Sequence, residues 1–299
     1  MPASASRSST SWLVGALTPA SAEKAAIHSW LSTTRELSPM SASGEVGILR
    51  RGVGLREVSH DGELDMVAVE EPLEIRVGGE PLAVTMRTPG FDEELAAGFL
   101  YGEGLVTEAP RLGPSEDLAA NTIEVQGVLV REPSTRRFYT TSSCGVCGKG
   151  ALEEVAVHAP VLGAGPRVAR ELLASLPDRL VQPGFARTGG LHAAGLFETG
   201  GELSCVREDV GRHNAMDKVV GWALLAGRLP LREQLLCVSG RLSFELVQKA
   251  AVAGAPVLVG VGAPTSLAVE LARDRNLTLC GFARNGGVNV YTAPERVAP

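Results

Sequence analysis

The chain has 299 residues and a formal net charge of −6, and 44% of its residues are hydrophobic while 21% are charged. This composition supplies enough apolar residues for one large or two ordinary globular domains. The negative charge argues against a broad nucleic-acid-binding face. The sequence also lacks a run of about 18 apolar residues, so we expect no transmembrane helix and no membrane partner.

The cysteines are few, five in all, which is unlike a secreted domain held together by disulfides. Three of them, Cys205, Cys237 and Cys280, stand in apolar stretches and are predicted to be small buried core residues. Residues 1–45 are rich in Ser, Ala and Thr and lack the apolar core of a signal peptide. We therefore expect a disordered or weakly helical extension on a cytoplasmic protein.

Residues 46–150 carry the pattern of a small α+β lobe. Short β-prone runs surround a Gly78-Gly79 turn, and a helix is predicted to begin at a capping Asp92 and to end near Gly102. Residues 108–120 are predicted to be a loop. The expected strands are 66–69, 73–77, 81–86, 122–130 and 137–141.

Residues 151–299 change character, because short apolar runs now alternate with helical segments of about ten residues. Such alternation is typical of right-handed βαβ crossovers and of a largely parallel sheet. The expected strands are 235–238, 256–261, 277–282 and 288–291. Three helices are expected: one from about 214 to 225, one that follows residues 239–241 and ends at about 253, and one that follows residues 262–266 and ends at about 275. The fold class is therefore predicted to be α/β, with an α+β small lobe.

Three consecutive strands in this half end in small, polar and basic residues. The loops are 239–241, 262–266 and 282–287, and two of them contain Arg241 and Arg284. In a parallel sheet these loops meet at one edge, where helix N-termini and guanidinium groups favour anions. Ordinary turn chemistry explains each loop equally well, so both interpretations stay open here.

A glycine-framed thiol pair, Cys144-Gly145-Val146-Cys147, precedes a predicted helix at 151–158. The positive end of that helix and the nearby Lys149 would lower the pKa of the thiols and so favour the reactive thiolate. Four roles are consistent with these residues: half of a zinc site completed by His192 and His213, thioredoxin-like disulfide exchange, persulfide carriage, and a purely structural role. The residues by themselves do not separate the four roles.

A second dense segment is Glu208-Asp209-Val210-Gly211-Arg212-His213-Asn214-Ala215-Met216-Asp217-Lys218. Helical spacing would bring Asn214, Asp217 and Lys218 close together on one face. The segment is consistent either with a solvated, salt-bridged helix cap or with part of a functional site. His192, His213 and Asp217 could orient a substrate or only hold the lobes together.

Taken together, ordered blocks from about residue 60 to the C-terminus resemble the formate dehydrogenase accessory sulfurtransferase family (FdhD type). The CxxC pair alone would not be specific, whereas the number and order of the blocks are. The blocks are Phe99-Leu100-Tyr101-Gly102-Glu103-Gly104, Ser143-Cys144-Gly145-Val146-Cys147-Gly148, Thr188-Gly189-Gly190-Leu191-His192, the whole Glu208-to-Lys218 segment, Ser239-Gly240-Arg241-Leu242-Ser243 with Lys249-Ala250, and Gly281-Phe282-Ala283-Arg284 with Tyr291-Thr292.

The resemblance implies a sulfurtransferase that takes sulfur from a cysteine desulfurase and delivers it to the molybdenum bis(molybdopterin guanine dinucleotide) cofactor of formate dehydrogenase. Cys144 would carry the persulfide and Cys147 would be the second thiol. The cofactor, a bound substrate, would contact Arg241 and the stretch Phe282-Ala283-Arg284-Asn285-Gly286-Gly287. The resemblance also implies a cytidine-deaminase-like three-layer α/β domain, a homodimer and no permanently bound metal.

Two alternatives from other classes follow. A zinc-dependent deaminase would need a His-x-Glu followed downstream by Pro-Cys-x-x-Cys. Ala194 lies where that Glu should be, and the CxxC pair precedes His192, so the sequence argues against deamination. The second alternative is a chaperone that binds the molybdenum cofactor without chemistry, and such a protein would tolerate loss of the thiols.

Overall fold

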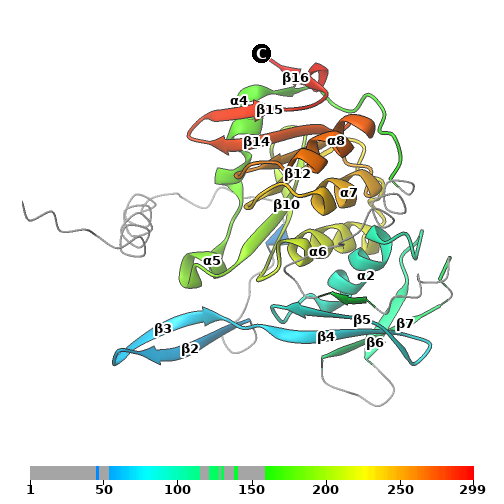
Figure 1. Ribbon diagram of the computed structural model, residues 1–299, viewed down its shortest axis with the longest axis vertical. Coiled ribbons are helices and arrows are strands. Elements are labelled where there is room, and N and C mark those ends of the chain that lie inside the picture. Colours follow the sequence, from blue (N-terminus) through cyan, green and yellow to red (C-terminus); the bar gives the residue numbers. More distant parts are fainter. Residues whose placement is uncertain (1–44, 47–53, 115–120, 128, 131–137, 141–158) are drawn as a thin grey trace, which may run out of the picture. The chain divides into compact units, whose positions relative to one another are not determined.

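The computed structural model describes residues 45–46, 54–114, 121–127, 129–130, 138–140 and 159–299 (Figure 1). The thiol pair Cys144 and Cys147, the predicted helix at 151–158 and nearly all of the predicted extension lie outside these residues. Two larger sheets organise the described part: a seven-stranded sheet formed mainly by the C-terminal half and a five-stranded sheet formed by residues 71–140.

The seven-stranded sheet has the order β1-β11-β10-β12-β13-β14-β15. The predicted parallel crossovers are confirmed for β12, β13 and β14, and β1 also pairs in parallel with β11. The other three pairs are antiparallel, so the sheet is mixed rather than largely parallel. The connections from β10 to β11 and from β14 to β15 are short turns, which can join only antiparallel neighbours. The strands are β1 (Glu45–Val46), β10 (His192–Glu198), β11 (Leu203–Asp209), β12 (Gln234–Val238), β13 (Val257–Gly260), β14 (Thr278–Arg284) and β15 (Gly287–Val290).

Helices cover both faces of this sheet. One face packs on α6 (Arg212–Leu225), α7 (Phe244–Val252) and α8 (Ser266–Asp274), the other on α4 (Arg170–Ser175) and the 3₁₀ helix η1 (Leu176–Arg179) (Figure 1). Alternate residues of β10 supply the two cores, because successive side chains of a strand point to opposite faces. Leu196 packs towards the α6 side and Phe197 towards the α4 side. The predicted three-layer α/β architecture is confirmed.

The five-stranded sheet has the order β6-β7-β4-β5-β8 and is covered by α2 (Asp92–Gly102). Its strands are β4 (Glu71–Val77), β5 (Glu80–Arg87), β6 (Arg111–Pro114), β7 (Thr122–Gln126) and β8 (Phe138–Thr140). A separate ribbon is formed by β2 (Leu55–His60) and β3 (Glu63–Ala68). The remaining short elements are α5 (Pro183–Thr188), η2 (Pro294–Arg296), and the parallel pair β9 (Val168–Ala169) and β16 (Val297–Ala298).

Three local predictions in this lobe need correction. The predicted loop at 108–120 contains strand β6, and the strand predicted at 122–130 ends at Gln126. Asp92 is the first helical residue rather than the cap; the capping position is Phe91, with φ 61°. The Asp92 carboxylate instead accepts two 2.9 Å hydrogen bonds from Arg87, a pairing that local sequence patterns do not reveal.

The two lobes meet where α2 crosses α6 at two glycines (Figure 1). A Cβ added to Gly98 would lie 1.9 Å from the Asp217 carbonyl oxygen, and one added to Gly221 would lie 1.8 Å from the Glu94 carbonyl oxygen. The helix backbones are therefore in direct contact. Arg207 on β11 also holds α2 in place, because its Nε lies 2.6 Å from Glu94 Oε2 on that helix.

The prediction that Cys205, Cys237 and Cys280 are core residues is confirmed, since all three are fully buried. Burial raises the pKa of Cys237 far above its usual range and that of Cys280 to about 12. The Cys237 and Cys280 thiols therefore stay protonated and unreactive. Among the described residues, no group of His, Cys, Asp and Glu side chains could hold a metal ion, and no helix is long and apolar enough to cross a membrane.

Candidate functional site

The loops that follow β12, β13 and β14 lie together, as the sequence predicts. The Gly262 N–H donates to the Gly240 carbonyl oxygen (3.1 Å), and the Phe282 N–H donates to the Gly262 carbonyl oxygen (3.2 Å). Leu242 pairs in the same way with the loop after β13. These backbone bonds join three segments, far apart in sequence, into one continuous edge. We call this edge, formed by residues 239–243, 261–266 and 281–287, the strand-end surface.

The stretch 282–287 forms the outer part of the strand-end surface. Phe282 has φ 53° and remains 36% exposed, which is unusual for a bulky side chain because a positive φ costs energy. The Arg284 guanidinium lies 5.6 Å from the centre of the Phe282 ring. Ala283 is fully buried, so only its backbone belongs to the surface. The stretch therefore offers an exposed aromatic ring beside an exposed cation.

The tight turn between β14 and β15 is formed by Asn285 and Gly286. Both have positive φ, 52° and 74°, as two-residue hairpin turns require. Gly287 then pairs back with Arg284. The turn thus fixes where the Arg284 side chain begins, and Asn285, Gly286 and Gly287 are all exposed.

Arg241 and the two histidines lie at the inner part of the same surface. A Cβ added to Gly240 would lie 3.4 Å from His192 Nδ1, which places the start of β10 against the loop after β12. Burial lowers the pKa of His192, and the charges of Arg212, His213 and Arg241 lower it further against the opposing effect of Asp209. His192 is therefore neutral at pH 7.

His213 lies in the first turn of α6, where its Nε2 is 3.2 Å from Ser243 Oγ and 3.6 Å from Glu245 Oε2. The His213 imidazole lowers the pKa of Glu245 to about 2. Glu245 is therefore ionised at neutral pH and pairs with His213. The structure brings His192, His213 and Arg241 together, although they come from three different elements.

Asp209 has a structural task. Its Oδ2 lies 2.7 Å from Lys218 Nζ and accepts a 3.1 Å hydrogen bond from the Thr88 N–H. Its Oδ1 accepts from the Gly211 N–H (2.8 Å) and from Asn214 Nδ2 (3.1 Å). Lys218 also donates to the Thr88 carbonyl oxygen (2.9 Å). These groups join the end of β5 to the start of α6. The predicted salt bridge is therefore present in this part of the segment, but it is buried and not solvated.

Asp217 points elsewhere. The sequence places it with Asn214 and Lys218 on one face of the helix, but its Oδ1 lies 2.7 Å from Lys249 Nζ on α7. Both side chains are buried, and burial raises the pKa of Asp217. This pair therefore joins α6 to α7 and has no part in the strand-end surface as defined above.

Sequence patterns missed Thr88 and Arg207, whose partners lie more than 100 positions away in the chain. They included Arg212 in the dense charged segment but assigned it no role, although its charge lowers the pKa of His192. Its position at the first turn of a helix, directly after a glycine, was the available signal. A basic residue is unexpected at the positive end of a helix.

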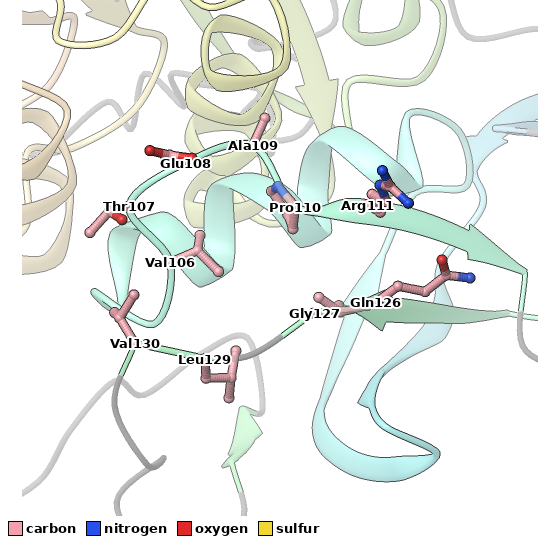
Figure 2. Close-up of a pocket in the computed structure, with 11 residues that line it drawn as sticks. Val106, Thr107, Glu108, Ala109, Pro110, Arg111, Gln126, Gly127, Leu129 and Val130 are labelled. Carbon is pink, nitrogen blue, oxygen red and sulfur yellow. The ribbon is translucent and has the colours of Figure 1, made fainter.

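A cavity of about 530 Å³ lies elsewhere, between the segment after α2 and strand β7 (Figure 2). None of the predicted site residues within the described ranges lines it. Its charged lining residues are Glu108 and Arg111, and the other side chains are apolar or uncharged, including Val106, Pro110 and Leu129. Its described lining contains no thiol, so we do not treat it as the candidate site.

The fold and the site define an α/β protein with a basic strand-end surface. The FdhD/NarQ family matches residues 68–298, and the chain belongs to this family. It is 52% identical over 274 residues to the sulfur carrier protein FdhD of Streptomyces coelicolor, covering 85% of this chain and 97% of that one. The corresponding protein of Mycobacterium tuberculosis is 50% identical over 255 residues, covering 78% of this chain and 92% of that one.

A solved structure agrees with these relatives. The crystal structure of a protein assigned as a formate dehydrogenase accessory protein, from Desulfotalea psychrophila, aligns with a TM-score of 0.63 and 28% identity. The alignment covers 82% of this chain and 97% of that one.

Proposed function

We propose that this protein is a sulfurtransferase that carries sulfur as a persulfide on Cys144 and delivers it to the molybdenum bis(molybdopterin guanine dinucleotide) cofactor of formate dehydrogenase. The observation that carries the proposal is the 52% identity to a sulfur carrier protein over 85% of the chain. The ordered sequence blocks and the basic strand-end surface support it. We expect a cytoplasmic homodimer that accepts sulfur from a cysteine desulfurase.

In the first step, the Cys144 thiolate attacks the outer sulfur of a persulfide on the desulfurase. A new S–S bond forms on Cys144, the S–S bond of the donor breaks, and the donor cysteine leaves as a thiolate. The step is a thiol exchange without net oxidation. It needs Cys144 as a thiolate, which a nearby cation and helix N-terminus would favour.

In the second step, the terminal sulfur passes to the molybdenum of the bound substrate. Cys147 assists by attacking the inner sulfur, so that a Cys144–Cys147 disulfide forms and hydrosulfide leaves toward the metal. A cellular dithiol then reduces the disulfide and restores both thiols. If Cys147 does not take part, its loss will slow turnover only slightly.

The strand-end surface is the proposed docking site for this substrate. Arg241 and Arg284 are exposed cations suited to phosphate oxygens, and the exposed Phe282 ring is suited to a flat guanine base. Phe282, Asn285, Gly286, Gly287 and the buried Ala283 give the stretch its shape.

The alternative is a chaperone that binds and protects the cofactor without carrying sulfur. The strand-end surface is consistent with it, because that surface concerns binding only. The thiols separate the two proposals, since a chaperone would keep its activity without Cys144.

The decisive experiment is intact-protein mass spectrometry after incubation with a cysteine desulfurase and cysteine. We expect the wild type to gain the mass of one sulfur atom, the gain to disappear on reduction, and Cys144→Ala to gain none. Cys237→Ala is the matched control, because its buried thiol should not react. Absence of the gain in the wild type, with the desulfurase shown to be active, would favour the chaperone.

A further inference from the structure

Four basic side chains converge at the inner end of the strand-end surface. His192 begins β10, Arg212 and His213 form the first turn of α6, and Arg241 follows β12. The charges of the other three all act on His192. Three separate segments thus contribute basic groups to one small region, which we call the basic cluster.

Arg212 is not neutralised within the part of the chain that the structure describes. Its Nε is buried and has no hydrogen-bond acceptor among these residues. A buried guanidinium N–H without an acceptor costs free energy, and folded proteins seldom leave such a group unsatisfied. Arg241, on the same side, is exposed and makes no hydrogen bond or ion pair within the described ranges.

The two nearby carboxylates are already engaged. Asp209 is fully buried and contacts Lys218, Thr88, Gly211 and Asn214. Glu245 balances His213. Neither carboxylate contacts Arg212 within the described residues, so the charges of Arg212 and Arg241 are left for a ligand to neutralise.

The start of α6 adds to the positive charge of this region. The helix spans 14 residues, and Gly211 occupies its capping position without a side-chain hydrogen bond. Its first backbone N–H groups therefore lack an intrahelical acceptor and give this end a partial positive charge. Two independent features, a helix N-terminus and a guanidinium without an acceptor, lie at the same place.

We propose that the basic cluster, His192, Arg212, His213 and Arg241, binds a phosphate group. Phosphate fits because its oxygens can accept the paired N–H groups of a guanidinium and the backbone N–H groups of a helix start. The proposal deepens the proposed function, because a dinucleotide substrate carries such phosphates. It assigns Arg212 and His192 to binding, in addition to the residues 282–287 and Arg241.

The first test is titration calorimetry of the full chain with inorganic pyrophosphate and with GDP. We expect Arg212→Met to weaken both by about tenfold or more, as loss of a charged hydrogen-bond pair would. The control is Arg273→Met, an exposed residue in the last turn of α8 at the opposite edge of the sheet, which should bind both as the wild type does. Unchanged pyrophosphate affinity in a folded Arg212→Met protein would overturn the proposal, and so would failure of the wild type to bind pyrophosphate.

These outcomes are separable from the proposed function. If Arg284→Ala weakens GDP binding while Arg212→Met does not, the outer surface binds the nucleotide and the basic cluster does not. Persulfide formation on Cys144 tests sulfur carriage independently of either result.

A second test uses pH and a probe that does not itself titrate. His192 faces Arg212 and His213 on α6, Arg241 after β12 and Asp209 on β11. A bound anion offsets the cations that lower the pKa of His192, so the pKa of His192 rises when the anion binds. Binding is therefore coupled to uptake of a proton, and we expect it to strengthen as the pH falls from about 8 to about 6. With sulfate as the probe, His192→Gln should flatten this dependence. An equally steep dependence in His192→Gln would remove His192 from the site.

Discussion

Lys218 Nζ lies 2.7 Å from Asp209 Oδ2, and both side chains are completely buried. Because they also contact Thr88, the pair determines how the small lobe meets the large sheet. We predict that Lys218→Met destabilises the protein by about 3 to 5 kcal/mol, since it leaves a buried carboxylate without its counter-charge. Chemical denaturation with a fluorescence readout measures this change.

The matched control for this pair is Arg228→Met. Arg228 pairs with Glu198, but both side chains are about one-third exposed, at 33% and 37%. We expect a loss of at most about 1 kcal/mol there. A similar loss of unfolding free energy in both variants would mean that the buried Asp209–Lys218 pair stabilises the protein no more than an exposed ion pair does.

The glycines at the α2–α6 crossing should tolerate no side chain. Gly221→Ala would place its Cβ 1.8 Å from the Glu94 carbonyl oxygen, so the helices must separate. We expect a loss of at least about 2 kcal/mol or failure to fold. Gly113→Ala is the control, because its Cβ would meet no atom within 4 Å. Equal melting temperatures for the two variants would contradict the close crossing.

The His213–Glu245 contact predicts how stability changes in acid. The folded-state pKa of Glu245 is lowered to about 2, so its contribution is present above the unfolded value of 4.5 and is lost as the pH falls towards 2. The side chain is 28% exposed, so we expect roughly 1 to 2 kcal/mol after solvent screening. Melting curves of the wild type and Glu245→Gln should converge over this interval. Parallel curves would refute the pairing.

Arg284 should matter for binding and not for sulfur loading. Its guanidinium is exposed beside the Phe282 ring, at the outer part of the strand-end surface. We predict that Arg284→Ala weakens binding of GDP by about tenfold while the persulfide on Cys144 still forms. Unchanged GDP affinity would remove this stretch from the binding site. Arg273→Met again serves as the control for general loss of charge.

Local sequence patterns predicted several elements of the large domain but not the strands β10 and β11. The strands at 235–238 and 277–282 and the helix at 214–225 were expected close to where they lie, because each depends on a short apolar run or a helical period. Burial of Cys205, Cys237 and Cys280 followed from their apolar neighbours in the same way.

What the sequence by itself determined was therefore a part of the strands and helices, the α/β class and, through ordered motifs, the family. Only the tertiary structure decided that β10 runs antiparallel between β11 and β12 and that Asp209 reaches Thr88. It likewise brought Arg212 beside His192. The physical reason is that periodicity reports interactions a few residues apart, whereas strand order, buried ion pairs and a basic cluster depend on contacts between distant segments, which form only when the chain packs.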